Sequence, residues 1–302
     1  MARSIGDDAP VREDRSSRTA EYVALFRALE TARPARERLF ADPFAREFLT
    51  GSLRVGERIA RMPLIGGSVP ALIDRRWPGP RASVVARTRM IDDAMLAALD
   101  HGLDQILLLG AGYDCRAYRI EAAGDVPVFE VDHPATQEVK RRVVRETLGF
   151  IPPNVTFVGV DFNRDDLGQV TAAAGFESGR RTFTVWEGVV SYLEADAVDA
   201  TLRWLRGVSG AGSELVFTYV HRGVLDGTRK FGDSAAWLDS VEAAGEPFVF
   251  GLDPAGLEPF LAERGWRLIE DVSTTEALER YGVDAAGVPA FYRVARAGLP
   301  AT

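Results

Sequence analysis

The feature that most constrains this chain is an alternation of short apolar runs with helical stretches, which begins after His101-Gly102. Continuous apolar runs of this length are expected of strands that are covered on both faces. The predicted strands are 106–109, 126–131, 155–160, 182–186, 215–220, 267–272 and 291–295. The predicted helices among them are 134–149, 164–173, 195–206 and one that starts at Asp253-Pro254. This order predicts an α/β fold with a parallel, doubly wound sheet.

The residues before 101 have a different pattern, of helices and turns. Residues 19–32 and 83–99 each place apolar side chains on one helical face. Asp42-Pro43 predicts a short helix with Asp42 as its N-cap and Pro43 at its first position. Residues 51–80 are rich in Gly and Pro and are expected to hold at most short helices.

These patterns predict the organisation of the chain. Residues 221–252 contain several glycines and form a long excursion over one edge of the sheet, and excursions of that length are often lids or binding loops. We expect a flexible N-terminus (1–17), a helical cap region (18–100) and an α/β domain (101–302) that carries the excursion as a lid-like insertion.

Composition narrows the class of protein. The 302 residues include 36 Lys and Arg against 44 Asp and Glu, a net charge of −8, which argues against a generic binder of nucleic acid or anionic membranes. Cys115 is the single cysteine, so no internal disulfide can form. The mixed-charge start does not resemble a signal peptide, and no apolar run approaches the ~18–20 residues that span a bilayer. We expect a cytoplasmic protein with no nucleic-acid or membrane partner, and its oligomeric state is left open.

The strongest local motif follows the first predicted strand. Leu107–Leu109 lead directly into Gly110-Ala111-Gly112. Glycines at such a turn let the backbone reverse tightly and let a ligand approach the main chain. Because any strand–helix turn can contain Gly-x-Gly by chance, the motif gains weight only from what accompanies it.

Acidic residues follow the next strands in the same way. Asp132 ends the second strand, where a carboxylate can accept both hydroxyls of a ribose. Asp161-Phe162 follows the third strand and can hydrogen-bond an exocyclic amine and stack on a purine. Glu187 follows the fourth strand, near the glycine turn, where a cationic ligand group could be met. The alternative for Asp132 and Asp161 is a helix N-cap, and Glu130, the competitor of Asp132, faces another side of its strand.

The acids distinguish between cofactors. A dinucleotide carries a pyrophosphate and prefers Gly-x-Gly-x-x-Gly, but Cys115 stands at the third glycine position. No P-loop motif is present, which disfavours nucleotide hydrolysis. S-adenosyl-L-methionine, with a ribose, an adenine, a sulfonium and an amino-acid end, fits an acid-lined cleft better. An NAD-dependent oxidoreductase and a non-catalytic adenosyl-ligand sensor are the alternatives.

The glycine segment Leu108–Arg119 resembles that of the leucine carboxyl methyltransferase family. The bacterial branch of this family includes S-adenosylmethionine-dependent methyltransferases of the tetracenomycin type, which methylate polyketide oxygens. The resemblance covers about residues 18–295 and is carried in order by further segments: Arg18–Ala20, Arg27–Glu30, Leu39–Phe44, Ala86–Arg89, Phe129–Pro134 and Glu187–Leu193. It implies a Rossmann-like class I methyltransferase sheet with an N-terminal helical cap.

The resemblance also implies roles for individual residues. Gly110, Ala111 and Gly112 would line the methionine part of the cofactor, Asp132 would hold the ribose, and Asp161 with Phe162 would hold the adenine. Glu187 would lie near the cofactor amino group, and Arg87 would reach the cofactor carboxylate, which suits a guanidinium fork. The candidates for contact with the acceptor substrate are Arg27, Tyr192, Tyr219 and Arg222. Cys115 departs from the family, which often has a hydroxyl residue there.

The remaining chemistry-bearing residues predict little else. His101, His133 and His221 have no metal-ligand spacing, so we assign no metal. Cys115 is expected to be a packed small residue rather than a nucleophile, although a helix start could lower its pKa, and Ser191 lacks a nucleophile elbow. We expect direct in-line methyl transfer to a carboxylate or hydroxyl oxygen of a small molecule. A hydroxyl acceptor would need a base, for which His221 is the first candidate.

Overall fold

The computed structural model describes residues 18–161, 165–232, 234–243 and 245–301. The predicted flexible N-terminus, 1–17, and the predicted adenine-binding residue Phe162 lie outside these ranges. The helices are α1 (Arg18–Thr31), α2 (Gly51–Ala60), α3 (Ser68–Arg76), α4 (Pro80–Asp100), α5 (Arg116–Arg119), α6 (Pro134–Leu148), α7 (Leu167–Ala173), α8 (Ala195–Val208), α9 (Arg222–Leu225), α10 (Ser234–Ala243), α11 (Leu257–Ala262) and α12 (Thr274–Arg280). Short 3-10 turns are η1 (Ala45–Phe48), η2 (Glu121–Ala123), η3 (Val190–Tyr192) and η4 (Pro254–Gly256).

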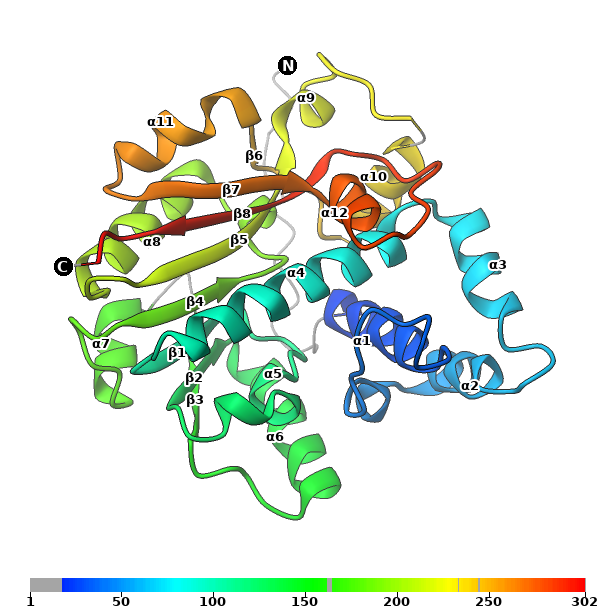
Figure 1. Ribbon diagram of the computed structural model, residues 1–302, viewed down its shortest axis with the longest axis horizontal. Helices are drawn as coiled ribbons and strands as arrows, with labels where there is room; N and C mark the ends of the chain where they lie inside the picture. The colour runs from blue at the N-terminus through cyan, green and yellow to red at the C-terminus, as the bar shows by residue number, and fades with distance from the viewer. Residues whose placement is uncertain (1–17, 162–164, 233, 244, 302) are drawn as a thin grey trace, which may run out of the picture.

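One sheet organises the chain (Figure 1). Its strands are β1 (Gln105–Leu109), β2 (Val128–Asp132), β3 (Val155–Gly159), β4 (Thr182–Trp186), β5 (Glu214–His221), β6 (Gly251–Leu252), β7 (Arg267–Ser273) and β8 (Tyr292–Gly298). Their order is β3-β2-β1-β4-β5-β8-β7, and β6 pairs with the end of β5. The predicted strands are therefore all present, and the doubly wound α/β prediction is confirmed.

The expectation of a wholly parallel sheet is wrong at β8. This strand runs antiparallel to both β5 and β7. The segment between β7 and β8 contains only α12 and loops, which stay at the end of the sheet where β7 finishes (Figure 1). Because the chain does not cross back over a face of the sheet, it re-enters from that same end and runs in the opposite direction.

The strands read as continuous apolar runs because both faces of the sheet are covered. In β1, Ile106 and Leu108 pack in one core cluster with Ile91 of α4. Leu107 and Leu109 pack in a second cluster with side chains of α8 and α11. Since neighbouring residues of a strand point to opposite faces, each face takes alternate residues of the same run.

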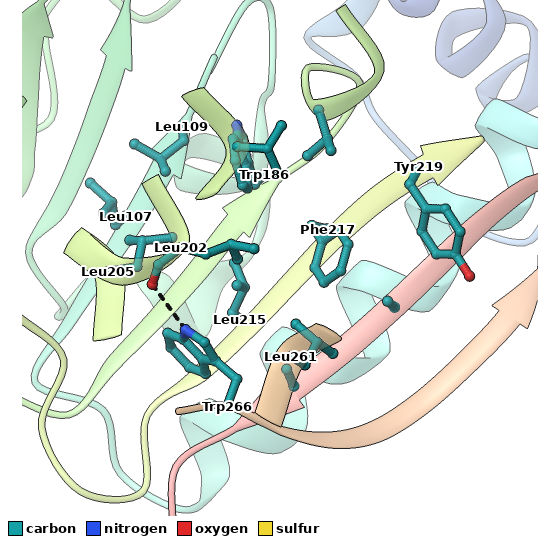
Figure 2. Close-up of a cluster of buried hydrophobic side chains, with 14 of the residues drawn as sticks. Leu107, Leu109, Trp186, Leu202, Leu205, Leu215, Phe217, Tyr219, Leu261 and Trp266 are labelled. Carbon is teal, nitrogen blue, oxygen red and sulfur yellow. Dashed lines mark hydrogen bonds between the residues drawn. The ribbon is translucent and has the colours of Figure 1, made fainter. Parts of the chain in front are cut away.

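The second of these clusters is shown in Figure 2. Leu202 and Leu205 of α8 lie against Leu107 and Leu215 of the sheet, and Trp266 closes the cluster beside Leu202. The Trp266 indole Nε1 donates a 3.1 Å hydrogen bond to the Leu202 carbonyl oxygen. A buried indole N–H needs such a partner, so this bond sets the position of the ring as well as filling the core.

The helices before residue 101 cover the carboxyl end of the sheet and one of its faces. α4 lies across that face in Figure 1, and its Ile91 and Met95 belong to the core cluster of β1 and β4. The short helix expected at Asp42 is a 3-10 turn that begins at Ala45. Its N-cap is Phe44 rather than the predicted Asp42. Asp42 supports the turn from outside, because its Oδ1 accepts from the backbone N of Phe44 and Ala45 while its Oδ2 meets Arg27.

The 221–252 segment contains α9 and α10 and returns to the sheet as β6. It leaves from β5 and returns as β6, which pairs with the end of β5. It extends beyond the carboxyl ends of the strands, where Trp237 of α10 stacks on Tyr292 at 5.5 Å between ring centroids. The segment therefore lies at the end of the sheet where the predicted site residues gather.

The buried leucines of α8 provide a test of this fold. Leu202→Ala removes a side chain that is 1% exposed, and we expect it to lower the free energy of unfolding by about 2–5 kcal/mol. Leu96→Ala on α4 is the control, because that leucine is 42% exposed and its loss should change the free energy by under about 1 kcal/mol. Equilibrium urea unfolding measures both, and equal effects would contradict the packing described here.

Candidate active site

The predicted site residues meet at the carboxyl ends of the central strands. β1 lies between β2 and β4, and the pairs Leu109–Val131 and Leu108–Val185 are in register. The residues at or directly after the ends of these strands, Gly110, Asp132 and Glu187, therefore emerge at one edge of the sheet. The strand order reverses its direction at β1 and β4, which is where open α/β sheets bind ligands.

The glycine turn needs its glycines. Gly110 has φ +66° and Gly112 has φ +43°, a region that side-chain-bearing residues rarely adopt. A Cβ on Gly110 would lie 2.3 Å from Cγ2 of Val189, so the turn has no room for a side chain there. The Ala111 amide donates to the Val131 carbonyl at 3.0 Å and fixes the turn against the end of β2.

Asp132 braces this turn. Its Oδ2 accepts from the Gly112 amide and its Oδ1 accepts from the His133 amide. Burial raises the pKa of Asp132, and the two amide bonds act against that rise. The N-cap of α6 is His133, whose Nδ1 accepts from Ala135, so the capping alternative for Asp132 is wrong. Each carboxylate oxygen keeps a further lone pair for a ligand.

Glu187 is held by two guanidinium groups. Arg87 Nε donates to Oε1 at 2.7 Å, and Arg116 donates to Oε2 at 2.8 Å. Burial disfavours the ionised form of Glu187, but Arg116 and Arg87 outweigh it and lower the pKa. The Arg87 side chain also lies over the ring of Tyr292, at 5.1 Å from its centroid. Sequence reasoning placed Glu187 and Arg87 together, and the structure shows them as an ion pair.

Arg116 is a site residue that sequence reasoning missed. Its side chain is 1% exposed and contacts three carboxylates, those of Asp92, Asp114 and Glu187. Asp92 also pairs with Arg119, so the network joins α4, the glycine turn and the end of β4. In the sequence, the signal for this role was a pair of oppositely charged residues, Asp114 and Arg116, shortly after the glycines. Because either residue could have been exposed there, the pair alone did not indicate a buried network.

The Asp114 carboxyl belongs to the same network. Burial alone would raise its pKa, but Arg116 and then Arg27 lower it to about 2. Its Oδ1 also accepts from the Arg116 amide at 2.7 Å. The lowered pKa values of Asp114 and Glu187 favour the ionised form of both carboxyls.

Asp161 lies at the far side of the site, at the end of β3. The amide of Val160 donates to the Asp132 carbonyl at 3.0 Å, so Asp161 follows a residue that is tied to the β2 end. The Asp161 amide donates to the carboxylate of Asp165 at 2.8 Å. α7 begins at Leu167 with Asp166 as its N-cap, so Asp161 does not cap that helix.

Aromatic side chains form the wall next to Arg87. Tyr192 lies 5.3 Å from Phe248, and Phe248 lies 6.4 Å from Tyr292, between ring centroids. Burial, with Tyr292 and Glu246 nearby, raises the pKa of Tyr192. Among the substrate-binding candidates, Tyr192 is therefore the one that the structure brings to Arg87.

α1 covers the glycine turn. A Cβ on Gly112 would lie 3.5 Å from the Cβ of Ala20, and Thr19 hydrogen-bonds Glu246 of the 221–252 segment. Arg27 is buried and engaged with Asp42, 3.0 Å away, and with the Tyr113 carbonyl. The Arg27 side chain thus fastens α1 to the residues that follow the glycine turn.

The side chains of three other candidate site residues, Tyr219, Arg222 and His221, are hydrogen-bonded to other groups of the protein. The Tyr219 hydroxyl donates to Asp271 at 2.9 Å on β7, and in Figure 2 the ring points away from Trp186 at the end of β4. Arg222 is exposed and bonds the Gly251 carbonyl at 3.2 Å. His221 accepts from the Gly223 amide at Nδ1 and lies 3.3 Å from Arg229 at Nε2. Burial and then Arg229 lower the pKa of His221.

The Cys115 side chain is fully buried, and burial, with Asp42 nearby, raises the pKa of its thiol. The suggestion that a helix start could lower this pKa is therefore wrong. Across the described ranges, no group of three or more His, Cys, Asp or Glu side chains is placed to hold a metal. In the same ranges no helix combines the length and apolar character that crossing a membrane requires.

This arrangement of strand order, glycine turn and strand-end acids can be compared with known proteins. The family model for leucine carboxyl methyltransferase matches residues 20–206. The chain belongs to the leucine carboxyl methyltransferase family. Family membership confirms the predicted resemblance and makes this enzyme a methyltransferase, and it decides between the cofactor alternatives in favour of S-adenosyl-L-methionine over NAD.

Relatives in actinobacteria agree with the family. A protein of Frankia alni is 37% identical over 72% of this chain and 73% of its own length. One of Mycobacterium tuberculosis is 30% identical over 93% of this chain and 88% of its own. Both are described as a "Putative S-adenosyl-L-methionine-dependent methyltransferase".

Two solved structures share the fold at low identity. A DUF574 family protein of Streptomyces avermitilis has a TM-score of 0.55 and 16% identity, over 90% of this chain and 100% of its own. A structure from Thermobifida fusca, likewise described as a putative methyltransferase, has a TM-score of 0.57 and 18% identity, over 98% of this chain and 100% of its own. These likenesses support the class I methyltransferase fold.

The ion network predicts a specific response to acid. Ionised Asp114 stabilises the folded enzyme at pH values above 3.8, the pKa of this carboxyl in the unfolded chain. The stabilisation is lost as the pH falls toward about 2, the pKa of the carboxyl in the folded enzyme. The full contribution is about 2 kcal/mol, and about 1 kcal/mol of it should disappear between pH 6 and pH 3. Urea unfolding of the wild type and of Asp114→Asn should show their stability difference shrinking by that amount.

The control for this experiment is Asp196→Asn, because Asp196 is exposed in the first turn of α8. Its stability should stay parallel to that of the wild type at both pH values. A difference between the wild type and Asp114→Asn that is the same at pH 6 and pH 3 would contradict the depressed pKa.

Proposed function

We propose that this methyltransferase transfers the methyl group of S-adenosyl-L-methionine to a carboxylate or hydroxyl oxygen of a small molecule, by direct in-line displacement. The observation that carries the cofactor site is the meeting of Asp132, Glu187 and Arg87 around the glycine turn at one edge of the sheet. When bound, the cofactor supplies a methyl group on a positively charged sulfur that is a good leaving group.

The Arg87–Glu187 pair suits the amino-acid end of the cofactor. A guanidinium group can bind a carboxylate through two parallel hydrogen bonds, and a carboxylate can accept from an ammonium group. Arg87 and Glu187 are 2.7 Å apart and both are mostly buried. Arg116 would keep Glu187 in place and ionised when Arg87 turns to the ligand, because it binds the other carboxylate oxygen.

The ribose and adenine would lie along the ends of β2 and β3. Asp132 has its free lone pairs at the end of β2, beside Gly112. Asp161 would receive the adenine amine, with Phe162 as its partner. The preceding residue, Val160, is tied to the end of β2, because its amide bonds the Asp132 carbonyl. Gly110 and Gly112 would present bare backbone to the methionine part.

The choice between a carboxylate and a hydroxyl acceptor depends on whether the site offers a general base. A carboxylate is ionised at neutral pH and needs no general base, so orientation and exclusion of water would supply most of the rate enhancement. His221 is poorly placed to act as a base, because the Gly223 amide and Arg229 occupy its ring nitrogens. A carboxylate acceptor is therefore favoured over a hydroxyl.

The acceptor pocket would be formed by the helical cap region of residues 18–100 together with the lid-like 221–252 segment. Tyr192 would face this pocket together with Phe248 and Tyr292, whose rings lie near one another. Arg27, Tyr219 and Arg222 would shape the pocket through the elements that they fasten rather than by contact. The aromatic wall favours an acceptor with an apolar or planar body next to its reacting oxygen.

Asp132→Asn tests the ribose site. We expect S-adenosylhomocysteine to bind about tenfold to one hundredfold more weakly, because hydrogen bonds to a charged group contribute about 1.5–3 kcal/mol. Isothermal titration calorimetry measures the dissociation constant, and the exposed Asp196→Asn is the control that should bind as the wild type does. An undiminished affinity would place the ribose elsewhere.

A product analysis tests the reaction. The enzyme is incubated with S-adenosylmethionine that carries a tritiated methyl group and with panels of carboxylic acids, phenols and alcohols. A methyl ester releases volatile labelled methanol on alkaline treatment, whereas a methyl ether keeps the label. We expect label on oxygen and, for a carboxylate, a rate that does not change between about pH 6 and pH 8 because no base is titrated.

Label on nitrogen, carbon or sulfur would exclude the proposed acceptor class. Cofactor binding without transfer to any member of a broad panel would favour the adenosyl-ligand sensor.

A further inference from the structure

Exposed apolar side chains gather on the hairpin of residues 51–77, which comprises α2, α3 and the loop between them; we call it the α2–α3 hairpin. Of nine large hydrophobic side chains that are exposed in the described chain, five lie here. They are Val55, Met62, Leu64, Ile65 and Leu72. Leu64 is 98% exposed, at the tip of the loop. Monomeric proteins rarely gather apolar groups in this way without a partner.

The charge of the α2–α3 hairpin is opposite to that of the whole chain. It contains five arginines and two acids, a net charge of +3 in a chain of net charge −8. The arginines are Arg54, Arg58, Arg61, Arg75 and Arg76. Both acids are already paired, Glu57 with Arg61 and Asp74 with Arg81. Arg58 and Arg75 are exposed, and neither has an ion-pair partner among the described residues.

The two kinds of side chain lie next to each other. Arg54 and Arg58 of α2 and Arg61, directly after it, follow one another at helical spacing, and Val55 of α2 and Met62 of the loop each come one residue after an arginine of this series. The loop then presents Met62–Ile65 at the outer margin of the molecule, on the right of Figure 1, away from the sheet. A projecting apolar tip flanked by arginines is typical of segments that lie in a membrane interface.

We propose that the α2–α3 hairpin docks on an anionic lipid bilayer, with Met62–Ile65 inserted among the lipid headgroups and the arginines bound to lipid phosphates. This surface is the local exception to the absence of a membrane partner that the net charge predicts. The charge also orients the enzyme, because an anionic bilayer attracts this hairpin and repels the acidic remainder of the chain.

Charge favours a bilayer over a second copy of the chain. A second copy of the chain would bring one set of unpaired arginines against another, and like charges across an interface oppose binding. The hairpin is also firmly attached to the enzyme, since Glu21 of α1 accepts from the Thr50 amide and hydroxyl at 2.7 Å, at the start of α2.

The test is co-sedimentation of the full chain with two kinds of vesicle, one of phosphatidylcholine alone and one with about a third of phosphatidylglycerol. We expect binding to the anionic vesicles that falls as salt is raised. Arg58→Gln/Arg75→Gln should weaken it about twentyfold or more, at about fivefold for each arginine near an anionic surface. Leu64→Ser/Ile65→Ser should weaken it at least about tenfold, through the lost apolar contact.

Matched controls lie elsewhere on the surface. Phe150→Ser removes an apolar side chain that is 58% exposed, and Arg36→Gln removes an arginine that is 86% exposed. Neither should change vesicle binding, and thermal unfolding should confirm that all variants stay folded. Since binding is measured without cofactor or acceptor, the result does not depend on the proposed reaction.

Three outcomes would overturn the docking proposal. One is no binding to either kind of vesicle, and another is equal binding to both. The third is a dimer, measured by light scattering, that Leu64→Ser/Ile65→Ser dissociates, because the hairpin would then be an interface between two copies.

Discussion

The ion network centred on Arg116 is the constraint on which the site depends. Its guanidinium group is almost fully buried, and burial of a charge is costly unless each N–H finds an acceptor. Asp92, Asp114 and Glu187 supply those acceptors from α4, the glycine turn and the end of β4. Removing one partner would leave a buried charge uncompensated, so the three elements are held in one arrangement even before a ligand is bound.

The sheet could be predicted because its strands are covered on both faces and therefore have continuous apolar sequences. In β1 every residue is apolar or buried, since one set of alternate residues faces α4 and the other faces α8. The position of Asp132 was equally predictable, because a residue directly after a strand must emerge at the carboxyl end. The direction of β8 could not be predicted, since nothing in an apolar run distinguishes a parallel strand from an antiparallel one. The short strand β6 was not predicted either.

Side-chain partners could not be predicted in the same way. Tyr219 lies near the end of the expected strand, but alternation turns it to the α8 face, where its hydroxyl bonds Asp271. His221 and Arg222 were near the site in sequence, yet backbone groups of the following turn and of β6 engage them. Arg116 escaped for the opposite reason: a charged residue after a turn is usually exposed, and its burial follows only from the convergence of carboxylates distant in sequence.

The Arg87–Glu187 pair gives a physical reason for the choice of cofactor. The two side chains neutralise each other, and a ligand end with one positive and one negative charge can separate them while the net charge of the buried region stays unchanged. A pyrophosphate would instead add two negative charges beside Glu187 and Asp114, which lie on either side of Arg116. At these distances in a mostly buried site, like charges repel strongly. In the proposed binding mode, the site would therefore select against a dinucleotide by electrostatics, independently of the missing third glycine.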